Sequence, residues 1–457
     1  MKQTSELILF FFIHFLGSPI AYCQADQETT QRERTTKVVQ ELAFEKLADI
    51  KLNGKTNFKD AAINLHDGQS ALHVGLFTGE NQYLLLDQKQ NAATIIPLPG
   101  WMYPVTIPNS TRILAGQGET VGLLEPMAQK KVLATMPHLM EFGDLLLPAV
   151  SENGAFVCTR PTSNHIQIFH GGTGKPITPP IKQTGRILQM QFTSDSKYLC
   201  TIASRKQVDG TPERKVSVPK VNPGNEGLKV WNSANGDLVA GPLGSGIQFQ
   251  HSGSPTTYDP VTERVVTVNH SESDESAISS KLRIYPISKN AAPITIELPS
   301  HISGVRWIDQ SHLLVKGKRM ATQQPTSLHG YDQNPMFVVD LNTSKPDFIE
   351  VAADTGFYWA IDSTSKYFAT SVATPEGNFA TCWKVGQTEP LWSRKGNFLA
   401  FGDQGWLVVT QPGRHVEICS QETGEVSIAF DNVLETILNG DQFWLCKKTN
   451  LEVWQQK

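Results

Sequence analysis

The sequence predicts an all-β protein in which four-stranded antiparallel sheets follow one another along the chain and close into a ring. Three observations lead to this prediction. A short pattern of strand, turn and strand recurs along most of the chain, no long amphipathic helical pattern interrupts it, and the strands are apolar on both of their sides.

The recurring pattern is clearest in two stretches that lie far apart. SDSKYLCTIAS runs from Ser194 to Ser204, and DSTSKYFATSV runs from Asp362 to Val372. In both, a polar turn precedes a short apolar strand, and Asp and Ser suit a turn because their side chains bond to nearby backbone amides. Such turns recur about every 40 to 60 residues through most of the chain, a spacing typical of repeat proteins.

Two further strands follow each of these hairpins. LKVWNSANGDLVAGP and VEICSQETGEVSIAF are examples, and each has a glycine at the turn between the third and fourth strands. Glycine supplies the positive φ that a tight hairpin needs. Each unit is therefore expected to be a four-stranded meander. The sequence indicates about seven to nine such units, of which Trp101 to Pro137 is the weakest.

Apolar residues fill consecutive positions of strands such as FVCT and YLCT, so a single sheet would leave one apolar side in water. Sheets stacked radially around an axis cover one another on both sides, and that arrangement is a β-propeller. The last unit, from Leu434 onward, has only three strands. The segment from Val38 to Leu52 can supply the fourth, which closes the ring and removes two exposed sheet edges.

Parts of the chain resemble the WD-repeat propeller family. Gly227 to Leu243 and Asn164 to Ile181 look like the third and fourth strands of bacterial WD-type blades, and FTSDSKYLCTIAS looks like their first turn. The family's Trp-Asp ending is degraded, because the residues that follow Trp231, Trp383 and Trp454 are Asn232, Lys384 and Gln455. The family's histidine before the first strand has candidates at His138 and His301. The resemblance implies a binding scaffold without catalysis.

Residues 1–25 have the pattern of a secretory signal peptide, with Lys2 before a short apolar run and small residues after it. Cleavage is expected near Cys23 to Ala25, followed by a polar linker at 26–37 and the propeller at 38–457. The protein is thus expected to be exported to the periplasm or beyond, with no transmembrane span after cleavage. Two alternatives stay open: lipidation of Cys23, which follows Tyr22 rather than a small residue, and an uncleaved anchor.

The composition argues against a nucleic-acid partner. The 457 residues are 18% charged with a net charge of −4, and no basic stripe stands out. The chain has no CxxC, HExxH, Walker or nucleophile-elbow pattern in a suitable context, so we expect no cofactor, no metal and no catalytic residue.

Five cysteines lie beyond the predicted leader: Cys158, Cys200, Cys382, Cys419 and Cys446. The first, second and fifth occupy equivalent second-strand positions of different units. Neighbouring sheets lie about 10 Å apart, whereas a disulfide needs Cα atoms within about 7 Å, so these three should not pair with one another. The aspartates of the recurring turns are expected to form the turns rather than a calcium array: Asp67, Asp195, Asp259, Asp309, Asp362, Asp403 and Asp441.

Three consecutive units carry long loops between their second and third strands: Ser204 to Gly227, Asn269 to Ser280 and Lys316 to Pro335. In a ring of meanders these loops emerge on the face that also carries the connections between units, and grouped insertions often mark a binding face. Ligand-binding candidates are basic residues of the first loop, Arg205, Lys206, Arg214 and Lys215, and residues expected just before first strands, Trp101, Arg186, His251, Arg306 and Trp359.

The functional prediction is an exported, monomeric and non-enzymatic scaffold that binds a protein or peptide partner through this face. One alternative is a propeller enzyme of the lactonase or quinoprotein type, with its active site at the mouth of the channel. Another is a carbohydrate or cell-envelope binder that uses exposed tryptophans.

Overall fold

The structure is a computed structural model that describes residues 42–51, 56–57, 63–66, 69–76, 81–87, 92–108, 110–125, 131–139, 146–204, 225–243, 258–270, 280–287, 292–318, 334–342, 347–352, 359–374, 376–403, 405–439 and 442–457. These residues form strands and turns and contain no helix. The predicted leader and linker at 1–37 lie outside the described residues. Among those that are described, no helix is long and apolar enough to cross a membrane.

The described strands form nine antiparallel sheets in chain order, here called blades 1 to 9. Blade 1 comprises β2 (Thr56–Asn57), β3 (Ile63–His66), β4 (Gln69–Leu76), β5 (Asn81–Asp87) and β6 (Ala92–Pro97). Blade 2 comprises β7 (Met102–Thr106), β8 (Ile113–Gln117), β9 (Thr120–Glu125) and β10 (Lys131–Pro137). Blade 3 comprises β11 (Ala149–Val150), β12 (Phe156–Thr162), β13 (His165–His170) and β14 (Ile181–Lys182).

The middle blades have the same order. Blade 4 comprises β15 (Ile187–Phe192), β16 (Tyr198–Ser204), β17 (Asn225–Asn232) and β18 (Leu238–Leu243). Blade 5 comprises β19 (Tyr258–Asp259), β20 (Arg264–His270), β21 (Ser280–Pro286) and β22 (Ile294–Leu298). Blade 6 comprises β23 (His301–Trp307), β24 (His312–Lys318), β25 (Met336–Asp340) and β26 (Asp347–Ala352).

The last blades complete the circle. Blade 7 comprises β27 (Trp359–Ile361), β28 (Tyr367–Thr374), β29 (Gly377–Lys384) and β30 (Trp392–Lys395). Blade 8 comprises β31 (Asn397–Phe401), β32 (Trp406–Gln411), β33 (His415–Ser420) and β34 (Val426–Phe430). Blade 9 comprises β35 (Glu435–Asn439), β36 (Gln442–Cys446), β37 (Asn450–Gln456) and, from the other end of the chain, β1 (Phe44–Lys51).

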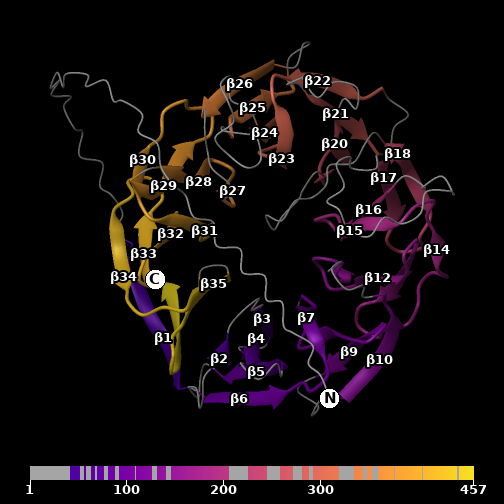
Figure 1. Ribbon diagram of the computed structural model, residues 1–457, viewed down its shortest axis with the longest axis horizontal. Coiled ribbons are helices and arrows are strands. Elements are labelled where there is room, and N and C mark those ends of the chain that lie inside the picture. Colours follow the sequence, from indigo (N-terminus) through magenta and orange to yellow (C-terminus); the bar gives the residue numbers. More distant parts are fainter. Residues whose placement is uncertain are drawn as a thin grey trace, which may run out of the picture.

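The blades surround an axis, with each first strand nearest to it and each fourth strand on the rim (Figure 1). This arrangement confirms the predicted closed β-propeller. The weakest predicted unit, Trp101 to Pro137, is a complete blade. In blade 1 the first strand is in two pieces, because β2 and β3 both pair with β4.

The N-terminal strand closes the ring, as the sequence predicts. β1 pairs antiparallel with β37, from Phe44 opposite Gln456 to Lys51 opposite Asn450. The Phe44 ring packs edge-on against Trp406 of blade 8 and Phe443 of blade 9. The two ends of the chain therefore share one sheet, and the sheet edge that blade 9 would otherwise expose is covered.

Among the described residues, each interface from blades 1 and 2 to blades 8 and 9 has its own apolar core. Between blades 3 and 4, for example, Ile166 and Ile168 pack with Leu199 and Trp231. Separate clusters fill the other interfaces from blades 1 and 2 to blades 8 and 9. Second and third strands are buried along consecutive positions rather than at alternate ones, as in β12 and β33. Both sides of these sheets are thus covered by neighbouring blades, which is why the strands are apolar throughout.

The two Ser-Lys-Tyr stretches form equivalent first turns in blades 4 and 7. The N–H of Thr193 donates to the carbonyl of Tyr198, and the N–H of Asp362 donates to the carbonyl of Tyr367. In the second turn the Asp362 carboxylate accepts the N–H groups of Lys366 and Tyr367, both at 2.8 Å. These bonds confirm that the repeated motif is a turn that leads into a second strand.

Aspartates cap first turns in the neighbouring blades as well. Asp259 accepts the N–H of Val261 in blade 5, and Asp309 accepts the N–H of Ser311 in blade 6. In blade 4 the acceptor role is shared, because Asp195 accepts the N–H of Lys197 while the Thr193 hydroxyl accepts that of Tyr198. Four of the predicted turn aspartates thus accept turn N–H groups, Asp403 also lies in a turn, and Asp67 and Asp441 lie outside the described residues.

Candidate functional site

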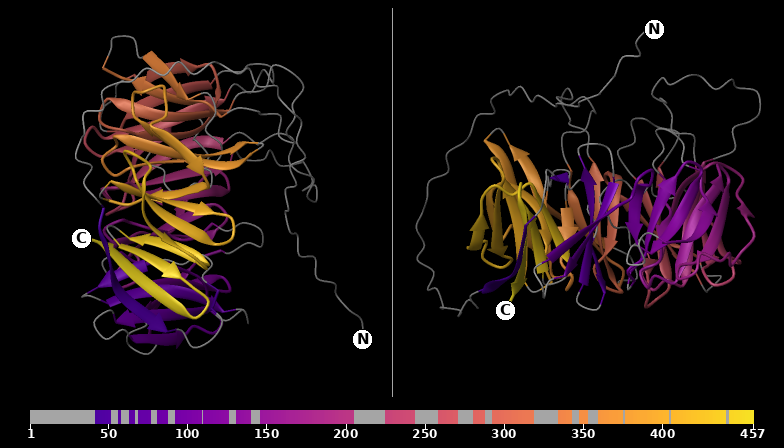
Figure 2. Two further views of the ribbon diagram at one scale, coloured as in Figure 1. Left: turned by 90° about the vertical axis from the view of Figure 1, so that its left-hand side faces the viewer. Right: turned by 90° about the horizontal axis from the view of Figure 1, so that it is seen from below.

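The ring has two faces with different kinds of loop. On one, here called the hairpin face, the first and second strands and the third and fourth strands of each blade are joined. On the other, here called the connection face, the second and third strands are joined and the chain passes to the next blade. Figure 2 shows the ring edge-on, so that these two faces lie on opposite sides. The predicted binding residues that the structure describes lie just before a first strand or within one.

The three long insertions begin and end on the connection face. Ser204 pairs with Asn225 at the end of blade 4, and His270 pairs with Ser280 in blade 5. In blade 6, Lys316 pairs with Met336. The loops therefore join second to third strands, as the sequence predicts. Arg205, Lys206, Arg214, Lys215 and His251 lie outside the described residues.

Two of the predicted residues lie just before a first strand, as expected. Arg186 precedes β15 and is exposed, while its N–H donates to the Ser204 hydroxyl at 3.0 Å. Trp101 precedes β7 and is half-buried. Its ring lies against Gly122 of the same blade, where any side chain would collide with it, and packs beside Leu98. Arg186 is thus exposed beside the connection face, whereas much of the Trp101 ring is occupied by packing.

The other two predicted residues lie elsewhere than expected. Arg306 is within β23, close to its hairpin-face end, rather than ahead of the strand. Trp359 is the first residue of β27, but its side chain is only 7% exposed. The correction has a physical reason: side chains of a first strand point toward the neighbouring blades, so a large ring at this position is buried between two sheets rather than presented to solvent.

The structure brings Arg306 and Trp359 together across the interface between blades 6 and 7. The guanidinium carbon lies 5.0 Å from the centre of the Trp359 ring, which is cation–π geometry. Gly304, two residues earlier in β23, leaves room for the ring, since a β-carbon there would be 3.0 Å from Trp359 Cζ2. Arg306 and Gly304 point to the same side of blade 6, toward blade 7.

Sequence reasoning missed a second cation on this side of blade 6. Lys316 pairs with Gly304 in the adjacent strand, and paired residues share one side of a sheet. The side chain of Lys316 is only 4% exposed. The sequence pattern placed Lys316 at the start of a loop, but β24 continues through Lys318, and this added strand length carries Lys316 into the interface.

Burial alone lowers the pKa of Arg306. Arginine nevertheless stays protonated at any physiological pH, because its ordinary pKa is far above that range. The blade 6–blade 7 interface therefore holds a permanent, partly desolvated positive charge beside an aromatic ring. Such an arrangement can accept an anionic group.

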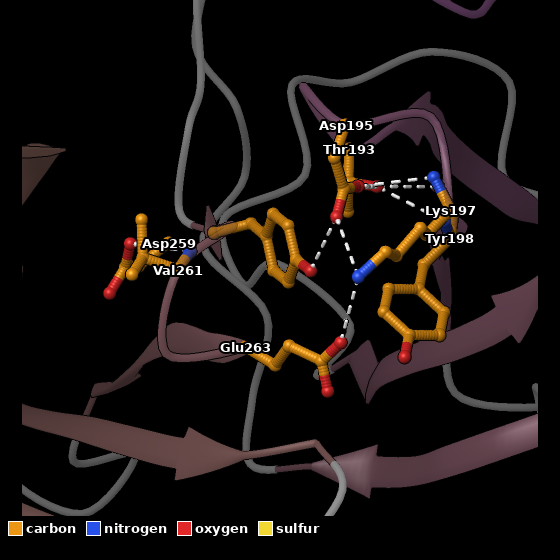
Figure 3. Close-up of polar contacts among 8 residues, drawn as sticks. Thr193, Asp195, Lys197, Tyr198, Asp259, Val261 and Glu263 are labelled. Carbon is orange, nitrogen blue, oxygen red and sulfur yellow. Dashed lines mark hydrogen bonds and ion pairs between the residues drawn. The ribbon is translucent and has the colours of Figure 1, made fainter.

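On the hairpin face, polar residues bind blades 4 and 5 to each other (Figure 3). The Asp195 carboxylate accepts the hydroxyl of Tyr258 at 3.0 Å, and Lys197 Nζ lies 3.1 Å from Glu263 Oε1. Burial, together with the bond to Asp195, raises the pKa of Tyr258. The polar groups of this cluster bond to one another, so it holds the blades together and is not a free binding site.

A second buried polar group holds the segment between blades 2 and 3. Arg160 donates to the carbonyl oxygens of Ile187 and Leu139, at 3.3 and 3.0 Å. His138 Nδ1 accepts the Arg160 N–H at 3.1 Å, so Nε2 carries the proton that it shares with the Leu146 carbonyl at 2.9 Å. Burial lowers the pKa of His138 to about 4, and the Arg160 charge acts in the same direction. His138 is thus neutral in the folded protein at pH 7.

Within the part of the chain that the structure describes, no three His, Cys, Asp or Glu side chains are grouped as metal ligands. The five described cysteines are buried and unbridged, which agrees with the prediction that Cys158, Cys200 and Cys446 do not pair. Burial raises the pKa of all five thiols, to about 12 for Cys200 and Cys419.

No known family model matches the chain, and no curated protein sequence matches it either. Among solved structures, the crystal structure of BamB from Moraxella catarrhalis is similar at 9% identity and a TM-score of 0.45, over 78% of this chain and 97% of BamB. The computationally designed protein Ika8 is similar at 10% identity and a TM-score of 0.44, over 90% of this chain and 99% of Ika8.

Proposed function

We propose that the protein is an exported, non-enzymatic, WD-like propeller that binds a protein or peptide partner through its connection face. The observation that carries this proposal is the position of the three long insertions. They lie in the consecutive blades 4, 5 and 6, and strand pairs fix their ends on one face. Insertions that gather on one face of a repeat protein often form its binding surface.

The contrast between the two faces supports this choice. First turns on the hairpin face are short and bonded to their neighbours, as in the contact of Ser196 with Asn153 and that of Asp362 with Gln421. The connection face carries the long insertions and the exposed Arg186. A closed ring with a packed core at its blade interfaces also presents loops with little loss of freedom on binding, which favours affinity.

The alternative of a carbohydrate site depended on exposed rings at Trp101 and Trp359. Those rings are half-buried and buried, respectively, so neither offers an open platform for a sugar. The protein-binding proposal does not depend on them. It requires instead that loop residues of the connection face, Arg205, Lys206, Arg214 and Lys215 among them, contact the partner.

Site-specific photo-cross-linking tests which face binds. A photoreactive residue replaces Lys182, exposed at the end of β14 beside the connection face, or Ser363, exposed in a first turn on the hairpin face. The two variants are matched in exposure and differ in face. In cells that make the protein, we expect one discrete adduct from position 182 and none from position 363. Equal adducts from both positions, or an adduct from 363 alone, would contradict the proposal.

Shortening the blade 4 insertion tests the loops directly. Residues 205–224 are replaced by a four-residue glycine-containing turn that lets Ser204 and Asn225 keep their pairing. The ring should keep its cooperative unfolding, because no described strand is removed, while the adduct from position 182 should weaken. An unchanged adduct would exclude this loop from the binding surface.

Export is the second part of the proposal. We expect the mature protein to begin near residues 24–26 and to be recovered outside the cytoplasm. Mass spectrometry of the intact mature chain distinguishes the three outcomes: a chain cut after the leader, a chain with a lipid on Cys23, and an uncleaved chain. The last would contradict release by a signal peptidase.

A further inference from the structure

Among the described residues, Arg306 lies over an aromatic ring without the carboxylate partner that Arg394 and Arg112 have. Arg394 pairs with Glu417 at 2.9 Å, and Arg112 pairs with Glu125 at 3.4 Å. Arg160 donates to two carbonyl oxygens. The Arg306 guanidinium lies over the Trp359 ring. Its buried Nε has no hydrogen-bond partner among the described residues, which is also true of Nε in Arg160, Arg283 and Arg394.

At the neighbouring interface, between blades 5 and 6, an arginine also lies over a tryptophan, and there it has a carboxylate partner as well. Arg264 of blade 5 lies 4.8 Å from the centre of the Trp307 ring of blade 6, as Arg306 of blade 6 lies over Trp359 of blade 7. Arg264 also has a carboxylate, since its Nη2 lies 3.5 Å from Asp259 Oδ2, and its Nε donates to the Thr262 hydroxyl at 2.6 Å. Arg306 therefore has the aromatic partner of this motif and no carboxylate partner among the described residues.

A guanidinium that is removed from water without an anion is unfavourable, because its lost hydration is not replaced. A carboxylate ligand supplies what is missing, since its two oxygens match the fork of guanidinium N–H groups.

The site lies beside the ring axis. β23 and β27 are the innermost strands of their blades, and Figure 1 shows both beside the axis. The side chain of Arg306 is partly exposed, in contrast to the buried Trp359 beneath it. A segment of the partner that extends along the axis from the connection face would meet the guanidinium near the hairpin-face end of β23.

We propose that Arg306, held by Trp359, binds a carboxylate of a bound peptide. This inference rests on the proposed function, because it names the chemical group by which a peptide partner is held. The carboxylate comes from an Asp or Glu side chain or from a chain terminus, and it takes the place that Asp259 has beside Arg264.

Three synthetic peptides test the inference by titration calorimetry with the full-length mature protein. One is acetyl-Ala-Ala-Asp-Ala-Ala-amide, the second has Asn in place of Asp, and the third is acetyl-pentaalanine with a free carboxyl terminus. We expect a peptide with a carboxylate to bind at least about tenfold more tightly than the Asn peptide, as a charge-assisted hydrogen bond requires. Preference for the first peptide identifies a side-chain carboxylate, and preference for the third identifies a terminus.

Variants assign the preference to Arg306. Arg306→Gln should abolish the preference for a carboxylate peptide. Arg306→Lys should keep only part of it, because lysine has the positive charge but not the paired N–H groups of a guanidinium. The control is Arg283→Gln, an arginine on the third strand of blade 5, away from the axis. An unchanged preference in Arg306→Gln, or no tighter binding of either carboxylate peptide by the wild-type protein, would overturn the inference.

The cross-linking experiment keeps this result separate from the proposed function. A face-specific adduct from position 182 that persists in Arg306→Gln, together with no carboxylate preference, would remove only the inference. The carboxylate preference could depend on Arg306 while the adducts do not depend on the face. That result would contradict only the proposal that the connection face binds the partner.

Discussion

Ser196 and Ser365 occupy the same position in two equivalent first turns, and their φ angles are 61° and 57°. The left-handed region is unfavourable for any residue with a β-carbon. Gly154 takes this position in blade 3, with φ of 70°. The serines differ in one respect, since Ser196 accepts the N–H of Asn153 from the neighbouring blade at 3.2 Å.

Glycine at the two positions should therefore have different effects. We expect Ser365→Gly to raise the free energy of unfolding by up to about 1 kcal/mol, as relief of the left-handed strain exceeds the added freedom of the unfolded chain. The free energy of unfolding of Ser196→Gly should be about 1 kcal/mol lower than that of Ser365→Gly, because the hydrogen bond from the N–H of Asn153 is lost. Urea unfolding of the two variants measures the difference, and an equal gain in both would contradict it.

His138 makes stability depend on pH. Its pKa is about 4 in the folded protein against an ordinary value of 6.5, so between these values the unfolded chain binds a proton that the folded chain does not. The contribution of neutral His138 is complete above about pH 6.5 and falls as the pH drops toward 4. The pKa difference corresponds to about 3 kcal/mol.

The variant His138→Asn should be less stable at pH 7 but should lose less stability between pH 6.5 and pH 4.5. The exposed His170→Asn is the control and should keep the slope of the wild-type protein. Urea unfolding at a series of pH values measures both slopes. A His138→Asn slope equal to that of the wild type would mean that another group causes the dependence.

At the scale of the strand, the cysteines show how the interfaces exclude water. Cys158, Cys200 and Cys446 lie in the second strands β12, β16 and β36, while Cys382 and Cys419 lie in the third strands β29 and β33. All five are buried, and their raised pKa values keep them as thiols at neutral pH. Cysteine acts here as a small apolar residue between sheets.

The five thiols should accordingly be unreactive toward a disulfide reagent in the native protein at pH 8. All five should react at once on unfolding in guanidinium, because they belong to one ring of mutually supporting sheets. The absorbance of the thiolate that the reagent releases gives the number of cysteine thiols that have reacted. Fast reaction of Cys200 or Cys419 in the native protein would show that the blade interface around it opens.

Strands and turns were predictable from the sequence because each depends on local pattern. The Asp and Ser turns and the continuous burial of the second strands follow from residues near one another in the chain. The closing segment before Leu52 follows from the strand that is missing in the last unit. Arg306 and Lys316 show where this reasoning ends. A residue faces the opposite side of its sheet if the strand shifts by one position. Lys316 is in an interface rather than a loop because β24 extends beyond it.

The number of blades was also difficult to predict from the sequence. Propellers commonly have about four to eight blades, and that expectation weakens the case for the unit from Trp101 to Pro137. Its strands nonetheless form a full sheet, with Leu114 and Leu123 buried against Val157 of blade 3. The number of units that closes a ring depends on the angle between neighbouring sheets, which no single repeat encodes.

At the scale of the whole molecule, the account depends on a closed ring, because closure covers both sides of every blade and fixes the two faces. The contact that closes the ring joins β1 to β37. Its polar contacts include Asn450 Nδ2 with Asp49 Oδ1 at 2.8 Å and Lys46 Nζ with Glu452 Oε1 at 3.2 Å. Residues from opposite ends of the chain are therefore neighbours only if the ring closes.

An engineered disulfide across this contact tests closure most directly. Glu45 and Gln455 are opposite each other, and paired positions in antiparallel strands have Cα atoms about 4.5 to 5.5 Å apart, within the range that a disulfide spans. The control pairs Glu45→Cys with Glu452→Cys, three positions out of register. Mass spectrometry and gel mobility of the oxidised, non-reduced protein should show a complete intramolecular bond in Glu45→Cys/Gln455→Cys and little in the control. Absence of the bond in the first variant, or equal bonding in both, would contradict the closed ring.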